Sequence, residues 1–414
     1  MKEIVSMVKL IRAYEDCRKS KLGSIEYQHF AIDAEYELYK LYIELNKNTY
    51  KPSSSIAFLV HHPKDREVFA ANFRDRIVQH LLINEIIDGF ETEVIDDSYS
   101  CRKGKGTLYG INQCYSKILE CSDNFKKKTY IGKFDIQSFF TSIDKDELWK
   151  CLETFLEKYY SKDEEQLEFL KRLTWLVIYD EPQKHCIFKT NFADWKCLPS
   201  NKSLFYCGEN KGLPIGNLTS QIFANLFLDL LDKYVKNELG IKYYGRYVDD
   251  FFIISNNKNE IMCCVKKIAD FLSSIHLKLH PNKIYIQEVC KGLEFLGVVI
   301  KPNRKYVKGL TKGHFFKRIK KFEEYLEYHK TKPIDIYDLK YILTVINSFL
   351  GYFRRCNSYK LRKKMLNERY TPNIRKFFTI NEEYTKIELI DEYNQIIRNT
   401  GKIKEKYQIV KIYV

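Results

Sequence analysis

The stretch Tyr243–Ser255, YYGRYVDDFFIIS, restricts how this chain can fold more than any other segment. Two adjacent carboxylates, Asp249 and Asp250, stand between runs of bulky β-branched and aromatic residues. Such runs favour strands, so we expect a hairpin with the acidic pair at its tight turn. Neighbouring carboxylates repel each other unless a cation lies between them, which indicates a divalent metal site. A solvated turn is the alternative, because a second such pair occurs at Asp96 and Asp97.

The composition favours a nucleic-acid partner. The 414 residues include 69 Lys and Arg against 54 Asp and Glu, a net charge of +15, and 15% are aromatic. Positive charge and aromatic side chains together suit a ligand that is polyanionic and can stack; a merely basic protein is the alternative. No apolar run reaches about 18 residues, so no membrane span is indicated. The 12 cysteines form no C-x-x-C pair, which argues against structural zinc and disulfides and favours the cytoplasm.

Other segments add candidate strands, loops and helices. Asp135 lies in residues 129–140, TYIGKFDIQSFF, where a strand is expected; a carboxylate inside a strand is costly unless it is paired or metal-bound. Residues 211–232 predict a Gly/Pro loop opening a helix, with Thr219 or Ser220 as its cap. LKLHPNKIYI and KGLEFLGVVI predict strands, and apolar residues spaced by 3 and 4 predict two amphipathic helices after residue 301.

Basic residues gather in three places where phosphate contacts are expected. The first precedes and enters a predicted helix, where surface ion pairs are the alternative. The second is a glycine-containing loop, SYSCRKGKGTLYG, for which a plain surface turn is the alternative. The third is a basic and aromatic stretch, residues 353–364. The candidates are Arg66 and Arg74, then Arg102, Lys103 and Lys105, then Arg354, Arg355, Lys360 and Arg362.

Taken in order, these blocks resemble those of the reverse transcriptases. FDIQSFF is similar to the first catalytic block, GLPIGNLTSQ to the nucleotide-contacting loop, YVDD to the Y-x-D-D box, LKLHPNK to the lysine block and EFLG to the primer grip. The resemblance implies an α+β right-hand polymerase fold, with an antiparallel palm sheet packed on helices. It places N-terminal helices and fingers in residues 1–128, the palm with finger insertions in residues 129–300 and a helical thumb in residues 301–414.

The same resemblance implies residue roles. Two Mg²⁺ ions, which Mn²⁺ can replace, are expected at the metal ligands, and dNTPs are the expected substrates. Lys283 is expected to assist the leaving pyrophosphate, with a surface lysine as the alternative. Phe140 is expected to exclude a 2′-OH, with Phe139 or a core role as alternatives. The metal ligands are Asp135, Ile136, Asp249 and Asp250; the nucleotide contacts are Arg66, Arg74, Phe140, Ile215, Gly216 and Gln221; nucleic-acid contacts beyond the basic residues are Tyr247, Phe295, Leu296 and Gly297.

Ile215 and Gln221 separate this chain from the group II intron pattern, which has Gln and Pro there. The chain resembles instead the enzymes of diversity-generating retroelements and their relatives in antiphage defence. This implies an RNA template, a cDNA product and, in the retroelement case, errors opposite template adenine. A small accessory protein or a homo-oligomer is a possible partner, and no membrane is expected. A catalytically silent nucleic-acid-binding protein on the same scaffold is the remaining alternative.

Overall fold

The computed structural model describes residues 3–19, 21–61, 64–331, 334–367, 371–391 and 411–412. The chain divides into two compact units. The first comprises Met1–Ser122 and Thr129–Gln287, and the second comprises Asp123–Lys128 and Glu288–Val414. The division after Gln287 lies before the palm–thumb boundary expected at residue 300, so the strands that follow belong with the C-terminal helices.

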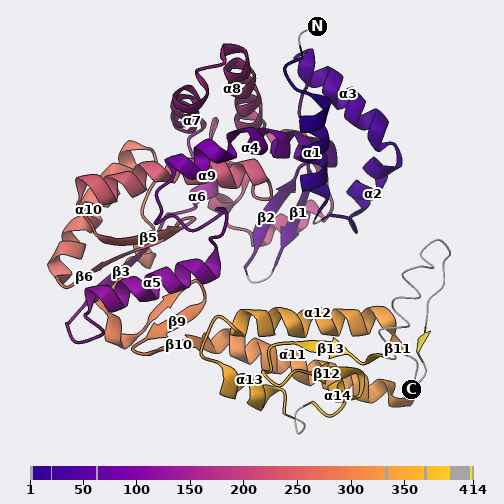
Figure 1. Cartoon of the computed structure of the whole chain (residues 1–414), viewed down its shortest axis with the longest axis vertical. Coiled ribbons are helices and arrows are strands. Elements are labelled where there is room, and N and C mark those ends of the chain that lie inside the picture. Colours follow the sequence, from indigo (N-terminus) through magenta and orange to yellow (C-terminus); the bar gives the residue numbers. More distant parts are fainter. Residues whose placement is uncertain are drawn as a thin grey trace. The chain divides into compact units, whose positions relative to one another are not determined.

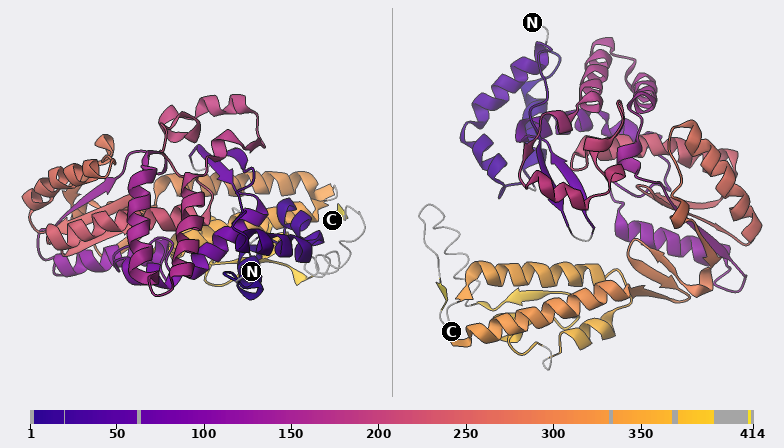
Figure 2. Two further views of the ribbon diagram at one scale, coloured as in Figure 1. Left: turned by 90° about the horizontal axis from the view of Figure 1, so that it is seen from above. Right: turned by 180° about the vertical axis from the view of Figure 1, so that it is seen from behind.

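Helices form the N-terminal part of the first unit (Figure 1). α1 (Met7–Arg18), α2 (Ile25–Ile32) and α3 (Ala34–Asn46) pack with α4 (Phe73–Glu93). Serine side chains accept hydrogen bonds at the first turns of α1 and α2, as helix N-caps do. The right-hand view of Figure 2 shows α7 (Lys145–Tyr160) and α8 (Glu164–Tyr179), in magenta, lying side by side.

A small finger-like sheet is joined to an insertion by one buried carboxylate. β1 (Ile56–Val60) and β2 (Arg66–Ala70) form a hairpin, and β4 (Ile187–Phe188) pairs in parallel with β1. Glu67 on β2 is buried and accepts hydrogen bonds from Trp195 Nε1 at 2.7 Å, Ser203 Oγ at 2.6 Å and the Leu204 amide at 2.8 Å. This carboxylate therefore fixes the insertion between α8 and α9 (Leu218–Lys233) to β2.

The central sheet has the strand order β5-β6-β3-β7. Its members are β5 (Tyr243–Tyr247), β6 (Asp250–Ser255), β3 (Tyr130–Asp135) and β7 (Tyr285–Glu288). α10 (Lys258–Ser274) contacts β6 and β3, whereas α5 (Thr107–Cys121) contacts β5 and β6 (Figure 1). The hairpin expected in Tyr243–Ser255 is confirmed, and the strand expected within residues 129–140 is confirmed for Tyr130–Asp135.

Side chains alternate between the two faces of this sheet. On one face the Phe134 and Phe251 rings stack 5.2 Å apart and are fully buried, and the same face meets α9 (Leu218–Lys233) and α10. Asp135, Asp250 and Lys133 alternate with these residues and project from the opposite face. The apolar face anchors the sheet and leaves the carboxylates at the edge of the other.

Two details of the expected elements are wrong. α9 begins at Leu218 with Asn217 at its N-cap, so Thr219 and Ser220 lie within the helix, where both are buried. The segment LKLHPNKIYI is not one strand, because a 3₁₀ turn occupies Pro281–Lys283 and β7 begins only at Tyr285. Proline supplies no backbone N–H to a strand ladder, which explains the interruption.

The second unit combines strands with a helical core. β8 (Leu293–Phe295), β9 (Val298–Lys301) and β10 (Arg304–Val307) form an antiparallel meander. α11 (Gly309–Tyr328) and α12 (Ile336–Phe353) are the two expected amphipathic helices, and their apolar residues are buried together. The remaining elements are α13 (Tyr359–Met365), α14 (Ile374–Phe377), β12 (Phe378–Ile380), β13 (Ile387–Leu389) and the pair β11 (Ile334–Asp335) and β14 (Lys411–Ile412).

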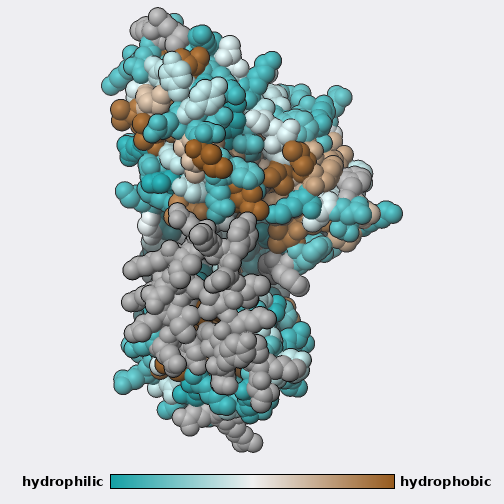
Figure 3. Space-filling model, turned by 90° about the vertical axis from the view of Figure 1, so that its right-hand side faces the viewer, coloured by the Kyte–Doolittle hydropathy of each residue, from teal (hydrophilic) through white to brown (hydrophobic). Residues whose placement is uncertain are grey.

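None of the described helices has the length and apolar composition that crossing a bilayer requires. The exposed apolar side chains include several on the N-terminal helices, such as Ile25 and Ile32 at 66% and 76% exposure. Figure 3 shows brown groups interspersed with teal ones over the upper part of the face drawn there.

Candidate active site

The β-sheet register brings the predicted carboxylates together. Asp135, the last residue of β3, is the direct cross-strand partner of Asp250, the first residue of β6. Directly opposed residues in an antiparallel pair have Cβ atoms about 4.5–5.5 Å apart. Asp249 precedes Asp250 in the turn, and its charge interacts with both of the other carboxylates. Asp135 and the adjacent pair Asp249 and Asp250, which lie far apart in the sequence, therefore share one end of the sheet.

The turn that carries Asp249 is held in an unfavourable backbone conformation. Val248 has φ of +56°, although β-branched residues rarely adopt positive φ. Its amide donates to Ser100 Oγ at 3.1 Å and its carbonyl accepts from Arg246 Nη1 at 3.0 Å. Arg246 is fully buried and forms an ion pair with Asp232, whose side chain is also fully buried. A buried ionic network thus fixes the turn and the direction of Asp249.

Two lysines provide counter-charges to the carboxylates. Lys283 Nζ lies 2.7 Å from Asp135 Oδ2, and Lys133 Nζ lies 3.0 Å from Asp250 Oδ2. The segment bearing Lys283 is joined to β3, because the His280 amide donates to the Asp135 carbonyl at 2.8 Å. This pairing explains how a residue 148 positions from Asp135 reaches it.

The electrostatic environment opposes negative charge on the carboxylates. Burial, followed by the negative charge of Asp135, raises the pKa of Asp249 to about 6. Burial also raises the pKa of Asp250, and the Lys133 ammonium opposes that shift. Asp135 Oδ1 and Asp250 Oδ1 are buried and have no hydrogen-bond partner among the described residues. A buried, unpaired carboxylate oxygen is costly, and a cation would satisfy both.

These oxygens fit a hard divalent cation such as Mg²⁺, which prefers oxygen ligands. The fit rests on the two unpaired oxygens and on the adjacent Asp249. The Ile136 side chain is buried in the core, and the residue bridges to Leu279, so only its carbonyl oxygen could take part in metal binding. The oxygens of the three carboxylates do not all point toward one another. Asp135 and Asp250 each direct one oxygen to a lysine instead.

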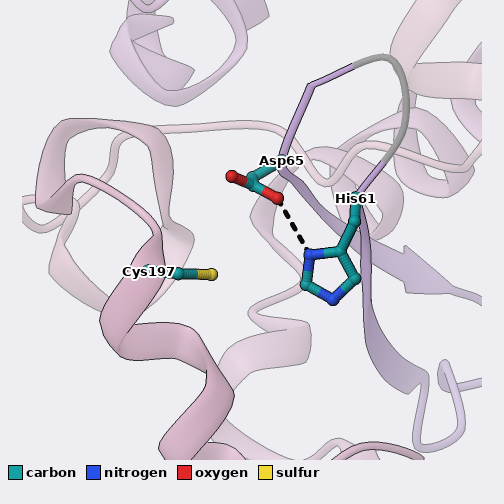
Figure 4. A group of neighbouring side chains, drawn as sticks. All are labelled: His61, Asp65 and Cys197. Carbon is teal, nitrogen blue, oxygen red and sulfur yellow. Dashed lines mark hydrogen bonds and ion pairs between the residues drawn. The ribbon is translucent and has the colours of Figure 1, made fainter.

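A tighter group of metal-ligating types occurs elsewhere in the first unit. Among the described residues, His61, Asp65 and Cys197 alone form a set of three whose ligand atoms all lie within 4.8 Å of one another (Figure 4). His61 Nδ1 lies 2.9 Å from Asp65 Oδ1, and all three side chains are exposed. The group joins the β1–β2 connection to the 3₁₀ segment Phe192–Cys197.

The expected nucleotide-contacting loop lies beside β2 and the short helix that follows β3. The Leu213 amide donates to the Phe140 carbonyl at 2.8 Å, and the Phe69 amide donates to the Ile215 carbonyl at 2.9 Å. Gly216 has φ of +126°, and a Cβ there would lie 2.9 Å from Val68 Cγ1, so glycine is required. The loop is thereby held between the short helix after β3 and the finger-like hairpin.

The two adjacent phenylalanines have different environments. Phe139 begins the short helix α6 (Phe139–Ser142) and is 3% exposed in the core, whereas Phe140 is only partly buried. Phe140 is therefore the better placed of the two to meet a nucleotide. Ile215 is also partly buried, Gln221 is exposed, and the Cys101 thiol lies 3.2 Å from Gln221 Oε1.

Arg66 and Arg74 lie in different environments. Arg66 is exposed on β2 and shares a face with Val68, which approaches Gly216. Arg74 instead forms an ion pair with Glu44 and lies 3.7 Å from Asp75. The Arg74 guanidinium therefore already has acidic protein partners, and its expected phosphate contact stays a prediction.

The basic loop before α5 is partly structural. Arg102 is buried and donates to Glu91 Oε2 at 2.9 Å and to the Val94 and Ile95 carbonyls at 2.9 and 2.6 Å. The Lys105 ammonium bonds to the Asp96 carbonyl at 2.9 Å. The phosphate contacts expected from these two residues are not supported, because their charged groups already have protein partners.

Other expected contacts remain accessible. Lys103 is exposed in the same basic loop. Tyr247 is partly exposed at the end of β5, and its hydroxyl lies 3.4 Å from Thr107 Oγ1. It is also the second cross-strand partner of Asp250.

The EFLG segment forms a tight hairpin in the second unit. Leu296 and Gly297 link β8 to β9, and both have positive φ, as two-residue hairpin turns require. Phe295 is fully buried, and the Tyr352 hydroxyl donates to the Gly297 carbonyl. Of the basic residues expected to bind nucleic acid here, Arg354 and Lys360 are exposed, Arg355 lies over the Tyr352 ring and Arg362 is buried.

Several residues that position the site were not among those expected from the sequence. Lys133, Ser100, Arg246, Asp232 and Asn225 support the carboxylates or the turn. The alternation along β3 could have indicated Lys133, which lies two residues before Asp135. The others contact the turn only through long-range folding, so no local pattern marks them.

Comparison with solved structures gives likenesses to telomerases of low similarity. One is apo telomerase from Candida tropicalis, truncated from its C-terminal domain, with a TM-score of 0.44, 13% identity, and coverage of 62% of this chain and 55% of that chain. Another is telomerase from Candida albicans in complex with a fragment of telomeric RNA, with a TM-score of 0.44, 13% identity and coverage of 78% and 60%. This chain thus spans little more than half the length of those telomerases.

Comparison with curated proteins gives no match. The family model for the reverse transcriptase (RNA-dependent DNA polymerase) matches residues 62–300, which is more than half of the chain. That interval contains the three carboxylates, the nucleotide-loop candidates and the EFLG hairpin. The chain therefore belongs to the reverse transcriptase family and has its α+β polymerase fold.

Proposed function

We propose that this protein is an RNA-directed DNA polymerase that extends a primer on an RNA template with dNTPs. The observation that carries the proposal is the cross-strand pair of Asp135 and Asp250, with Asp249 in the adjoining turn. The pair leaves two buried carboxylate oxygens without a partner. A silent nucleic-acid-binding protein would gain nothing from retaining this costly arrangement.

In the proposed mechanism, Asp135, Asp249 and Asp250 would hold two Mg²⁺ ions, with the Ile136 carbonyl as a further candidate ligand. Two such ions, when bound, lower the pKa of the attacking hydroxyl and neutralise charge on the phosphates. The Lys283 ammonium, 2.7 Å from Asp135, can stabilise or protonate the leaving pyrophosphate. Phe140 lies under the sugar and disfavours a 2′-OH, and the exposed Arg66 approaches the triphosphate. Most of the catalysis is positioning and charge stabilisation.

Primer extension on a defined RNA with Mg²⁺ tests this proposal. Asp249→Asn should abolish incorporation, because a neutral amide cannot replace the carboxylate as a metal ligand. Asp96→Asn is a matched control: Asp96 belongs to the other Asp-Asp pair and its side chain is 97% exposed. Loss of incorporation in the first variant alone supports the proposal, whereas extension by Asp249→Asn contradicts it.

We further propose an error-prone enzyme of the diversity-generating retroelement type, with antiphage defence as the second candidate role. Ile215 supports this choice: intron-type relatives have Gln there, whereas an isoleucine offers shape but no hydrogen bond. Losing a polar restraint reduces discrimination between correct and incorrect pairs. Because the Ile215 carbonyl is already held by the Phe69 amide, a side-chain change need not move the loop.

Sequencing cDNA made by the parent and by Ile215→Gln tests this role. We expect errors concentrated opposite template adenine in the parent and severalfold fewer in the variant. Equal error spectra without an adenine excess would instead favour defence. A template and variable repeat pair with a small accessory gene nearby supports the retroelement role, and a defence cluster supports the other.

A further inference from the structure

The second unit contains a cationic pocket that the polymerase chemistry does not use. Its volume is about 480 Å³, within the range of roughly 300–1,000 Å³ usual for small-molecule sites. Arg304 from β10, Arg354 from the end of α12, and Lys360 and Arg362 from α13 line it. None of the described residues that line it is acidic. Four cations around one hollow predict an anionic ligand.

Arg362 gives a second, independent indication of a ligand. The residue is 8% exposed, and its Nε atom is buried without a hydrogen-bond partner in the part of the chain that the structure describes. Burial, followed by the nearby charge of Arg354, lowers the pKa of its guanidinium; Glu383 opposes the shift but does not line the pocket. A buried guanidinium beside a second one is costly without a matched anion.

The pocket wall is held by the fold. The Asn357 amide donates to the Lys305 carbonyl at 2.9 Å, and the Lys305 amide donates to Asn357 Oδ1 at 2.9 Å. Ser358 Oγ donates to the Phe353 carbonyl at 2.6 Å. These bonds join β10, α12 and α13, the elements seen close together in Figure 1. The cations are therefore presented by a supported frame.

The same pocket offers an aromatic surface. Tyr359 is 48% exposed and lines the pocket beside the cations. Its ring packs edge-on against Tyr384, with centroids 5.9 Å apart, so it is supported from the β12–β13 connection. An exposed, supported ring can stack with a nucleobase, and arginine forks match the oxygens of a phosphate.

We propose that this pocket binds the terminal phosphate of a nucleotide, with the nucleoside against Tyr359. A phosphomonoester carries about −1.5 to −2 charge at pH 7, more than the single charge of a backbone phosphodiester. That suits several cations converging on one hollow rather than arranged in a row. A free nucleoside 5′-phosphate and the 5′-phosphorylated end of an RNA share this chemistry. The inference goes beyond the proposed polymerase activity and does not depend on it.

Fluorescence anisotropy with the full chain tests the inference, without dNTP or divalent metal. Two single-stranded RNAs of one sequence, labelled at the 3′ end, carry either a 5′-phosphate or a 5′-hydroxyl. We expect the 5′-phosphorylated RNA to bind about tenfold more tightly, as one or two charge-assisted hydrogen bonds imply. Competition with AMP distinguishes the sources: displacement by AMP indicates that a free nucleotide is bound too, and its failure indicates an RNA end.

Substitutions test whether a preference for the 5′-phosphorylated RNA arises from this pocket. Arg362→Gln and the exposed Arg354→Gln should each lose the 5′-phosphate preference; the second protects the test if the buried substitution impairs folding. Lys364→Gln is the matched control, because it removes one exposed charge from the same helix outside the pocket. Asp249→Asn should keep the preference while losing primer extension, which separates this inference from the proposed activity.

Two outcomes would overturn the proposal. One is equal affinity of the unmodified protein for the two RNAs together with no binding of AMP. The other is a 5′-phosphate preference that Arg362→Gln and Arg354→Gln both retain while remaining folded. General weakening of both RNAs by Arg354→Gln, with no end preference, would assign the cations to the RNA backbone instead.

Discussion

Asp249 combines a proposed catalytic role with a cost in stability. Its pKa is raised from 3.8 to about 6 by burial and by the charge of Asp135. The folded state therefore binds the proton more tightly than the unfolded state. The resulting stabilisation is present below the ordinary pKa and is lost as the pH rises through about 6. At neutral pH without a divalent cation, ionised Asp249 lowers the free energy of unfolding.

Asp249→Asn should thus stabilise the metal-free protein. We expect its free energy of unfolding at pH 7.5 to exceed the parent's by about 1–3 kcal/mol, since one pKa unit corresponds to about 1.4 kcal/mol. The gain should be nearly absent at pH 4, and saturating Mg²⁺ should stabilise the parent more than the variant. Urea unfolding at the two pH values measures this. A variant less stable than the parent at pH 7.5 would contradict the assigned burial of charge.

At the scale of elements, the hairpin turn depends on a network outside it. Arg246 Nε lies 2.7 Å from Asp232 Oδ1, and Arg246 Nη1 donates to the Val248 carbonyl. Arg246→Met would leave the Asp232 charge buried without its partner, at a cost of about 3–5 kcal/mol. It would also release the strained Val248 backbone.

We therefore expect Arg246→Met to unfold at lower urea and to lose primer extension even where it remains folded. Arg76→Met is a matched control from the first unit, because Arg76 is partly buried and donates to the Ala71 carbonyl at 2.8 Å but forms no ion pair with any described residue. A Mg²⁺ titration of the extension rate separates a displaced turn, which raises the metal requirement, from simple loss of folded protein. If Arg246→Met left both the stability and the Mg²⁺ requirement unchanged, the positioning role of Arg246 would be contradicted.

Local pattern predicted the elements whose residues interact with near neighbours. The runs of β-branched and aromatic residues on both sides of Asp249 and Asp250 predicted the β5–β6 hairpin, and spacing by 3 and 4 predicted α11 and α12. The loop containing Arg102 looked flexible from its glycines. Its guanidinium is nevertheless satisfied by the Glu91 carboxylate and by two carbonyls brought near by folding. The spacing of residues in the sequence does not reveal such long-range partners. The same holds for the contacts by which Glu67 fixes the insertion to β2.

At the scale of the whole molecule, the net charge of +15 overstates the charge available for RNA. Arg74, Arg102 and Lys105 already bind acidic groups or carbonyls of the protein, whereas Lys103 is exposed. RNA affinity should still fall steeply with salt, because each phosphate contact releases counterions. The slope of log affinity against log salt concentration should depend on the exposed cations alone.

The neighbours Arg102 and Lys103 test this distinction. The slope of log affinity against log salt changes by about 0.7 for each phosphate contact to single-stranded RNA. Lys103→Gln should therefore make the slope shallower by about that amount with no change in stability. Arg102→Gln should leave the slope unchanged and lower the midpoint of thermal unfolding, because Glu91 and the Val94 and Ile95 carbonyls lose their donor. The reverse result would mean that Arg102 leaves its buried site to reach RNA.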